Sequence, residues 1–510
     1  LRTTTFCSTG SAAMGWAVNG RAVVDEICPA SAAAATMKLP LMAGEATRGK
    51  QPNIVLIVCD QMNLDAIAAY KQQFDHNAWL CHWVDTPHLD ELIQNGVSFT
   101  ESHTPNPICC PARSSMFTGR YSLETGVVVN NVGIDQSVPN MGQWFEQNSN
   151  YDRVYCGKWH AGGPWNVPSV SGPRKIPGFD TLPNGPGNWG RHMDYGISTG
   201  VEAYVRNHKG DKPFLAVAGF MDPHDICFWS PRLSRGRTRD TDFFELGDQL
   251  PVLPPNQSYD FGEIWEMPTD YSDMQWQNYV YDYCRMVERL DRNVGRILRA
   301  VRDRDDETVV LFTSDHGDGV GRHSRTGKWN PYDEAVKVPF IAYGPNCGIQ
   351  RNVIDTEHLV NGVDIMSTVC DYAGIPTPPN SRGLSLRPLL EGKSVEWRNS
   401  VFMELREGGR IIRSERYKYV MCYETAPQKK GKPVNENYLT TDGKATMFLP
   451  GDTQRLKRVE QAMLFDMKND PWESRNLIDD PQFKSVVEEH EAMLAEYEST
   501  LIPGTEFTRR

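Results

Sequence analysis

The sequence predicts an α/β fold built on a parallel sheet, because buried strands alternate with amphipathic helices along most of the chain. Residues 54–58, 213–220 and 308–313 form nearly continuous apolar runs of strand length. Such runs are typical of strands that helices cover on both faces. Each run is followed by Asp or His side chains, and the carboxyl ends of parallel strands meet at one sheet edge. We therefore expect polar groups from distant parts of the sequence to converge there.

The chain between the second and third strands shows helical periodicity. Apolar residues between Val280 and Leu298 recur at intervals of three and four, which predicts an amphipathic helix over residues 279–301. The charged residues 302–307 predict a solvated turn into the next strand. Stretches rich in proline and glycine predict loops that form the walls of a substrate cleft; they cover residues 164–190 and 250–255.

The C-terminal part has a different pattern. A helix that starts near Asp364 is expected to end at Gly374, and Pro and Gly residues up to Gly392 indicate a linker. Short alternating segments then predict antiparallel strands at residues 400–405, 409–413 and 417–422, with a further segment at 462–467 and a terminal helix at 483–497. The predicted organisation is a leader remnant or disordered segment, a catalytic domain and a C-terminal subdomain, over residues 1–50, 51–395 and 396–510.

Composition limits the possible functions. The chain has 510 residues, and its net charge of -12 argues against a nucleic-acid-binding protein. Twelve cysteines are too few for a disulfide scaffold, and none forms a Cys-x-x-Cys pair. No apolar run is long enough to span a bilayer. Residues 1–50 are rich in Ala, Thr, Ser and Gly, as in an export leader or a flexible segment. The working expectation is a secreted or periplasmic enzyme.

The most informative motif is Cys109-Cys110-Pro111-Ala112-Arg113. Pro111 suits the first turn of a helix, and Gly119 is placed to end that helix. Cys109 would then lie beside the free N–H groups of a helix N-terminus, which attract anions. Taken alone, the motif could also be a buried pair of cysteines with a purely structural role.

This motif resembles the Cys-x-Pro-x-Arg signature of type I sulfatases, the formylglycine-dependent branch of the alkaline phosphatase superfamily. The resemblance extends over nearly all of the chain from residue 51. It implies a large, mixed, mostly parallel sheet flanked by helices, with a small C-terminal subdomain of four antiparallel strands and a helix. It further implies that a formylglycine-generating or anaerobic maturase enzyme oxidises Cys109 to formylglycine, whose hydrated aldehyde is the nucleophile. Cys110 is expected to matter far less.

The resemblance also implies a metal site with one Ca²⁺ per subunit. Its ligands would be Asp60, Gln61, Cys109 as formylglycine, Asp315 and His316, and oxygen ligands suit a hard divalent ion. Most sulfatases have two acidic residues at the first position, whereas this chain has Asp60-Gln61. That departure resembles choline sulfatases and phosphonate monoester hydrolases. Without the motif, Asp60 could be a strand-end cap and His316 a core histidine.

The remaining predicted catalytic residues are Arg113, Lys158, His160, His224 and Lys328. Lys158-Trp159-His160 resembles the Gly-Lys-x-His segment of the family, in which the lysine binds sulfate and the histidine attends the formylglycine diol. Alternation along a strand would place both side chains on one face. Arg113 and Lys328 would stabilise negative charge, and His224 would protonate the departing alcohol. His323 is expected to be structural.

The implied function is a sulfuric ester hydrolase that cleaves sulfate monoesters, with sulfated glycans favoured over small sulfate esters. This reaction needs a barrier reduction of about 20 kcal/mol, so a cluster of catalytic groups is expected. The alternatives are a phosphonate monoester or phosphodiester hydrolase, a choline-sulfatase-like enzyme, and a non-catalytic glycan-binding relative. The Lys158-x-His160 pair favours sulfate. Six aromatic residues are either sugar-stacking groups or core: Trp165, Trp189, Phe228, Trp229, Trp265 and Trp276.

Overall fold

The computed structural model describes residues 51–130, 132–161, 176–184, 189–229, 250–258, 269–304, 306–405, 409–422 and 462–502. The elements described below belong to one structural unit, Arg48–Arg510. The predicted leader segment, Trp165 and Trp265 lie outside the described residues, so these predictions remain predictions. The ten cysteines in the described part of the chain are free thiols.

A mixed, mostly parallel sheet of eight strands forms the centre of this unit, as the sequence predicts. The strand order is β5-β4-β6-β1-β7-β8-β2-β9. The central strand β1 (Asn53–Asp60) is parallel to both of its neighbours, β6 (Phe214–Pro223) and β7 (Thr308–Ser314). Strand β8 (Phe340–Tyr343) is antiparallel to β7 and β2. The other strands are β2 (Gly96–Phe99), β4 (Asp152–Gly157), β5 (Asp180–Thr181) and β9 (Val353–Asp355).

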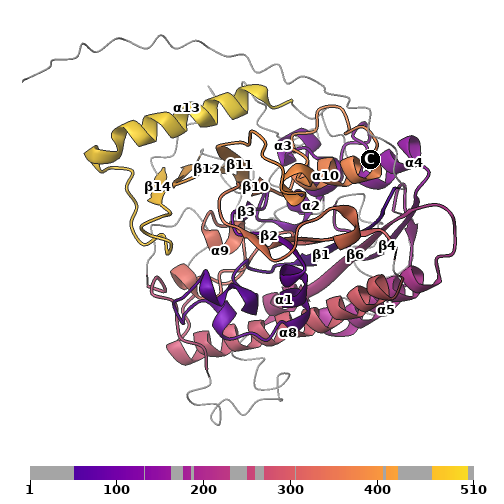
Figure 1. The fold of residues 1–510 in the computed structure, drawn as a ribbon. Coiled ribbons are helices and arrows are strands. Elements are labelled where there is room, and N and C mark those ends of the chain that lie inside the picture. Colours follow the sequence, from indigo (N-terminus) through magenta and orange to yellow (C-terminus); the bar gives the residue numbers. More distant parts are fainter. Residues whose placement is uncertain are drawn as a thin grey trace, which may run out of the picture. The chain divides into compact units, whose positions relative to one another are not determined.

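Helices cover both faces of the sheet (Figure 1). Alternate side chains of β1 divide between the two cores: Val55 and Ile57 join one hydrophobic cluster, and Ile54 and Leu56 join the other. Helices α1 (Pro87–Gln94), α5 (Gly190–Asn207) and α8 (Asp273–Arg304) contribute to the first core. Helices α2 (Cys109–Thr118), α4 (Met141–Asn148), α10 (Asp364–Ala373) and α11 (Arg387–Leu390) contribute to the second.

A four-stranded antiparallel sheet follows, in the order β11-β12-β13-β14, and the terminal helix α13 (Lys484–Thr500) packs on it through the third core. Its strands are β11 (Ser400–Leu405), β12 (Gly409–Ser414), β13 (Tyr417–Cys422) and β14 (Met463–Asp466). This sheet confirms the predicted C-terminal strands. The smaller elements are β3 (Ser102–His103), β10 (Val360–Asn361), α3 (Ser122–Thr125), α9 (Asp333–Val336), and the 3₁₀ turns η1 (Ala68–Gln72), η2 (Leu80–His82), η3 (His224–Phe228), η5 (Arg322–Ser324), η6 (Pro345–Cys347) and η8 (Pro481–Phe483).

Three sequence predictions about this fold were wrong. The predicted linker up to Gly392 contains helix α11, whose Leu389 and Leu390 pack in the second core. Residues 302–304 are helical rather than a turn, because basic residues suit a helix C-terminus and Arg304 donates to the Val205 and His208 carbonyl oxygens. The predicted loop at 164–190 contains strand β5 and the first residue of α5. Among the described helices, none combines the length and the apolar character that a membrane crossing requires.

Candidate active site

Cys109 is the first residue of α2, at the carboxyl edge of the central sheet. Ile108, with extended backbone, precedes it, Pro111 lies in the first turn, and Gly119 ends the helix at φ 71°. A left-handed residue after the last turn is the position that glycine occupies at least cost. All ten residues of α2 are buried. The local sequence therefore fixes the Cys109 thiol inside the protein at a helix N-terminus.

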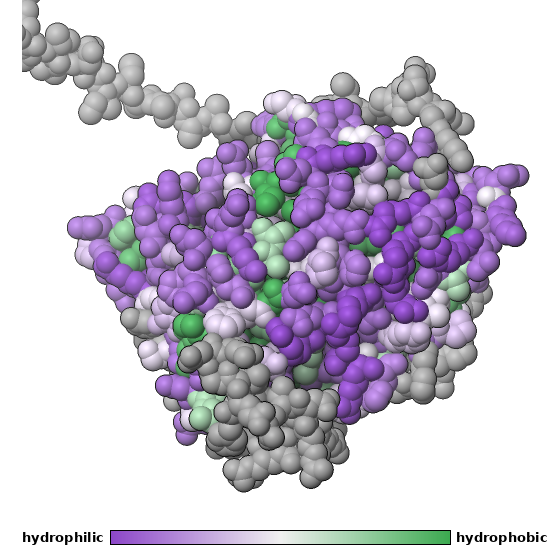
Figure 2. Space-filling view, turned by 60° about the horizontal axis from the view of Figure 1, so that its bottom comes forward, coloured by the Kyte–Doolittle hydropathy of each residue, from purple (hydrophilic) through white to green (hydrophobic). Residues whose placement is uncertain are grey.

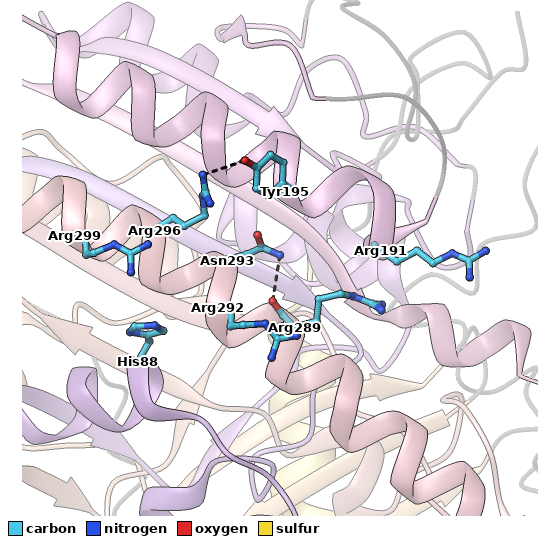
Figure 3. Close-up of a pocket in the computed structure, with 9 residues that line it drawn as sticks. His88, Arg191, Tyr195, Arg289, Arg292, Asn293, Arg296 and Arg299 are labelled. Atoms are coloured by element: carbon cyan, nitrogen blue, oxygen red, sulfur yellow. Dashed lines mark hydrogen bonds between the residues drawn. The ribbon is translucent and has the colours of Figure 1, made fainter. Parts of the chain in front are cut away.

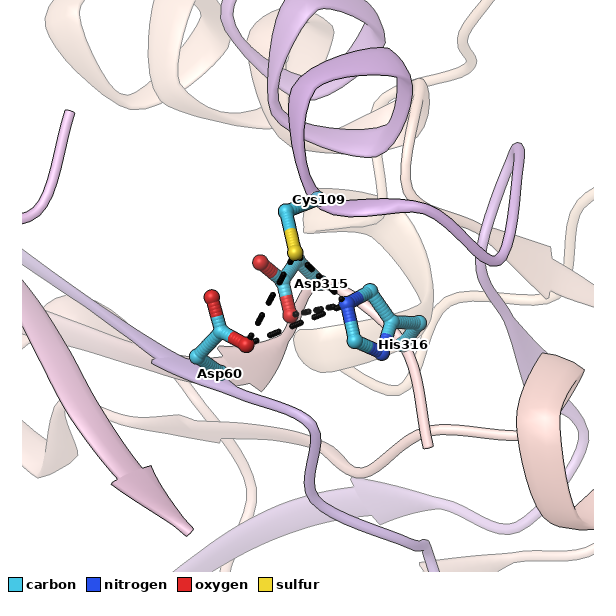
Figure 4. A group of neighbouring side chains, drawn as sticks. All are labelled: Asp60, Cys109, Asp315 and His316. Atoms are coloured by element: carbon cyan, nitrogen blue, oxygen red, sulfur yellow. Dashed lines mark hydrogen bonds and ion pairs between the residues drawn. The ribbon is translucent and has the colours of Figure 1, made fainter. Parts of the chain in front are cut away.

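Four potential metal ligands meet at this thiol. One ligand atom from each of Asp60, Cys109, Asp315 and His316 lies within 4.8 Å of the others, and all four residues are buried. Figure 4 shows the Cys109 side chain pointing from α2 toward the other three. The Cys109 Sγ atom lies 3.2 Å from His316 Nε2 and 3.9 Å from Asp60 Oδ1. We call this group the buried ligand cluster.

The buried ligand cluster suits a hard divalent cation. It offers two buried carboxylates, and carboxylate oxygens are ligands that hard divalent cations prefer. The His316 Nδ1 atom lies 2.9 Å from the Gly317 carbonyl oxygen, which leaves Nε2 directed at Cys109 and the carboxylates. Hydrogen bonds of this kind orient a histidine that binds a metal. The residues present therefore fit the predicted metal.

Three buried cations surround the same point. Lys158 Nζ is ion-paired with Asp60, and Lys328 Nζ lies 3.1 Å from Cys109 Sγ. Arg113 Nε donates to Asp315 Oδ2 at 2.7 Å, and its terminal nitrogens donate to the carbonyl oxygens of Lys158 and Cys59. The sequence-predicted Arg113, Lys158 and Lys328 thus converge with the ligand cluster. Together they place three positive charges at the buried ligand cluster, where Asp60 and Asp315 pair with two of them.

These charges alter the acidity of the site. Burial opposes ionisation of Cys109, but Lys158 and Lys328 together hold the pKa of its thiol well below the ordinary value. Burial and Cys109 oppose ionisation of Asp60, yet Lys158 and the other nearby cations keep its pKa low. Burial and the neighbouring Asp60 raise the pKa of Asp315. The site therefore favours an anionic group at position 109.

Gln61 lies beside the buried ligand cluster, and its side-chain amide is hydrogen-bonded to protein groups. Its Oε1 atom accepts from Lys328 Nζ at 2.7 Å and from the Cys227 thiol, and its Nε2 atom donates to Asp318 Oδ2 at 2.6 Å. Sequence reasoning missed Asp318, which also accepts from the Gly327 N–H beside Lys328. The Asp315-His316-Gly317-Asp318 run after β7 was the available signal. Metal ligation by Gln61 remains a prediction.

The prediction that Lys158 and His160 lie on one strand face was wrong. Strand β4 ends at Gly157, whose φ of 103° turns the chain, and His160 itself has a φ of 39°. Both side chains nevertheless reach the site. Burial lowers the pKa of His160, but Cys110 and Cys109 outweigh this and raise it to about 9.

His224 also reaches the site, from the turn after β6, where it interacts with Cys109 and both lysines. Burial and then Lys158 lower its pKa to about 4. The buried Nδ1 atoms of His160 and His224 have no hydrogen-bond partner within the described part of the chain.

Sequence reasoning missed the residues that hold the His224 turn. Arg289 from α8 donates to both carboxylate oxygens of Asp222, at 2.5 and 2.7 Å, and approaches Asp225 at 3.4 Å. The backbone N–H groups of Met221 and Asp222 donate to Asp194. Arg289 thus fixes the residues on both sides of His224. Nothing in the local sequence distinguishes Arg289 from the other arginines of α8.

The remaining predicted residues lie around the site or away from it. A pocket of about 210 Å³ adjoins Lys328 and is lined in part by Trp229, Tyr271 and Trp329. Trp276 is 1% exposed and belongs to the core, so it is not a sugar-stacking group. His323 pairs with Glu334 at 2.8 Å and stacks on Tyr332, which agrees with its expected structural role.

The arrangement suits an oxyanion beside residue 109. Residue 109 faces the metal ligands, Lys158 and Lys328 act on it directly, and His160 and His224 both approach it. Preorganised cations in a buried site stabilise developing negative charge far better than they would in water. The geometry therefore suits transfer of a small, highly charged group from an ester to residue 109.

Comparisons with known proteins agree with this geometry. The family model described as Sulfatase matches residues 52–375, and the model described as N-sulphoglucosamine sulphohydrolase, C-terminal, matches residues 321–430. Among curated relatives, the Delta 4,5-hexuronate-2-O-sulfatase of Bacteroides thetaiotaomicron is 27% identical over 496 residues, which cover 90% of this chain and 92% of the relative.

Two solved structures show the same fold. One is a protein in complex with its substrate D-glucosamine-2-N,6-O-disulfate, with a TM-score of 0.67 and 19% identity over 88% of this chain and 98% of the other. The other is the phosphonate monoester hydrolase of Agrobacterium radiobacter, with a TM-score of 0.65 and 20% identity over 90% of this chain and 100% of the other. The fold alone therefore does not separate sulfate from phosphonate chemistry.

Proposed function

The chain belongs to the sulfatase family and is a sulfuric ester hydrolase, and we propose that its substrates are sulfate monoesters of sulfated glycans. The observation that carries the proposal is the convergence of Lys158, Lys328 and Arg113 on the buried ligand cluster. Relatives named for sulfated sugars, including the hexuronate 2-O-sulfatase and the disulfated glucosamine complex, support the glycan class.

The nucleophile in this proposal derives from Cys109. A formylglycine-generating or anaerobic maturase would convert its thiol to an aldehyde, and the hydrate of that aldehyde supplies a hydroxyl group directed at sulfur. Asp60, Asp315 and His316, together with residue 109, would hold Ca²⁺. When bound, this ion adds a fixed positive charge at the sulfate oxygens.

The protein's own residues then have separate roles. Lys158, Lys328 and Arg113 bind the sulfate oxygens and stabilise their charge, because each is already buried at this position. His224 gives a proton to the departing alcohol oxygen. Conversion of Cys109 to formylglycine removes one of the two thiols that raise the pKa of His160, which favours its neutral ring, and His160 then takes a proton from the second hydroxyl of residue 109. A bound sulfate would offset the lysine charges that lower the pKa of His224, and would thereby favour its protonated ring.

The Lys158–Asp60 pair favours sulfate over the phosphonate alternative. It places a buried ammonium group directly at the ligand cluster, where the Gln61 and His316 pattern alone would fit either chemistry. We further propose a secreted or periplasmic location, because polymeric glycans do not cross membranes and the enzyme must meet them outside.

The proposal is tested with enzyme produced beside a formylglycine-generating enzyme. Defined sulfated disaccharides are incubated with it, and released sulfate is measured by ion chromatography, with an aryl sulfate and an aryl phosphonate ester in parallel. We expect sulfate release from at least one saccharide and a higher kcat/KM for the aryl sulfate than for the phosphonate. Faster phosphonate hydrolysis with no release from any saccharide would contradict the proposal.

A further inference from the structure

A groove rich in arginine runs along α5 and α8, on the helix layer that forms the first core. It has a volume of about 670 Å³, within the range of roughly 300–1,000 Å³ that small-molecule sites occupy. Its lining consists of His88, Gly190, Arg191, Tyr195, Arg289, Arg292, Asn293, Arg296 and Arg299. Figure 3 shows these side chains between α5, α8 and the start of α1. None of them belongs to the buried ligand cluster.

Four of the arginines that line the groove come from α8. Arg289, Arg292, Arg296 and Arg299 recur on α8 at intervals of three and four, so they share one helix face. Arg292 and Arg299 are exposed and seven residues apart, which separates them by about 10 Å along the helix axis. The face that carries α5 and α8 is largely hydrophilic in Figure 2.

Two of these arginines are available to a ligand. Within the described ranges, no carboxylate lies in ion-pairing distance of Arg292 or Arg299. The nearby acids pair with other arginines instead: Asp222 with Arg289, Glu202 with Arg296 and Glu91 with Arg302. Arg292 and Arg299 therefore carry two positive charges that no described carboxylate balances, and an anion bound between them would reduce their mutual repulsion.

The groove also has features that a saccharide would use. Tyr195 is 60% exposed, and Arg296 lies over its ring at 4.4 Å from the centroid, so the tyrosine is fixed at the groove wall. Exposed aromatic rings pack against the apolar faces of sugars, while guanidinium forks match sulfate and carboxylate groups. At Gly295 a Cβ atom would lie 2.2 Å from the His88 ring, so the glycine lets His88 close the groove floor.

We propose that this groove binds a sulfated or carboxylated segment of the glycan substrate at a second site, separate from the catalytic centre. The inference rests on the proposed function, because it takes its ligand from that substrate class. Arg289, which lines the groove, also contacts Asp222 and Asp225 on either side of His224. A chain held in the groove would therefore be retained near the active site between cleavage events.

The test measures binding in the inactive Cys109→Ala protein by fluorescence anisotropy with a long, labelled heparin oligosaccharide. We expect the added pair Arg292→Gln and Arg299→Gln to raise Kd about tenfold. The control pair Arg285→Gln and Arg475→Gln removes the same charge from exposed arginines outside the groove and should change Kd by less than about twofold. An equal loss in both pairs, or none in the groove pair, would overturn the proposal.

Competitors identify the ligand class. Unsulfated hyaluronan should compete less well than heparin, and single-stranded DNA should compete poorly. DNA that competes as well as heparin would overturn the proposal in favour of a nucleic-acid site.

A kinetic comparison in the active enzyme separates this proposal from the proposed function. The groove pair should keep kcat/KM on the best sulfated disaccharide and lose about tenfold on a long sulfated chain. Equal kcat/KM losses on both substrates would overturn the second site. If no saccharide releases sulfate but the groove pair still weakens heparin binding, the proposed function fails and the binding site stands.

Discussion

The Nζ atom of Lys328 lies 3.1 Å from the Sγ atom of Cys109, although 219 positions separate the two residues in the sequence. The same Nζ donates to Gln61 Oε1 at 2.7 Å, so the lysine is fixed from two sides. Asp318 completes the arrangement through Gln61 and the Gly327 N–H. A buried ammonium group held at the reactive position has no evident structural purpose, but it suits an anionic substrate.

Lys328→Met should reduce kcat/KM for sulfate esters by on the order of 10²–10³-fold, because one preorganised cation is lost from the transition state. Lys328→Arg should restore part of the activity. Steady-state kinetics on an aryl sulfate measures both variants, and Lys393→Met, at an exposed lysine, is the control. Near-normal activity of Lys328→Met would exclude the lysine from charge stabilisation.

Arg289→Gln should reduce turnover by about 10–100-fold, because the residues flanking His224 lose their anchor. Arg289 is a positioning residue, so its effect should depend on the leaving group. Esters of poorly leaving alcohols, which need protonation by His224, should lose more activity than activated aryl sulfates. Arg285→Gln on the same helix is the control. A loss that is uniform across leaving groups would point to a general structural defect instead.

Chelation with EGTA should abolish activity, and added Ca²⁺ should restore it, because Asp60 and Asp315 are two buried carboxylates within one donor cluster. Asp315→Asn should weaken the apparent affinity for Ca²⁺ in the same assay. Calcium titrations of the chelated enzyme give both values. Full activity after exhaustive chelation, with no metal detected by elemental analysis, would exclude the metal site.

Glu404 should make stability depend on pH. Burial raises its pKa to about 7, although Arg410 opposes the shift, and its carboxylate accepts from the Leu123 N–H. The folded-state pKa lies above the ordinary value, so this contribution to stability is complete at low pH and is lost as pH rises toward 7.

Glu404→Gln mimics the protonated form and should reduce the fall in the denaturation midpoint between pH 5 and pH 8. The midpoints are measured in guanidinium chloride, beside Glu396→Gln at an exposed glutamate. An identical fall in the wild type and Glu404→Gln would contradict the assignment.

Many of the strands and helices could be predicted from the sequence, because the patterns that indicate them are local. The apolar runs of β1, β6 and β7, and the Pro111 and Gly119 signals of α2, depend on nearest neighbours in the chain. The family resemblance then identified Asp60, Lys158 and Lys328 without any knowledge of distance. The predicted backbone conformation after β4 was wrong. Gly157 and His160 have positive φ values, so the strand ends before Lys158 and the predicted alternation of side chains does not continue.

Contacts between residues that lie far apart in the chain could not be predicted from this one sequence. No local pattern indicates that Arg289 on α8 forms an ion pair with Asp222, which lies 67 positions away in the sequence. Nor does any local pattern indicate that Asp318 accepts a hydrogen bond from Gln61, which lies 257 positions away. The sequence left open whether Trp276 stacks on sugars or lies in the core, and the structure buries it, because burial depends on which helices pack around a residue. The arginine groove likewise forms only when α5 and α8 lie side by side.

The most direct measurement is the mass of the peptide that contains residue 109, taken from active enzyme by tandem mass spectrometry. The account predicts an aldehyde in place of the Cys109 thiol, an unmodified Cys110, full loss of activity in Cys109→Ala and little loss in Cys110→Ser. An active fraction in which Cys109 retains its sulfur would contradict the account.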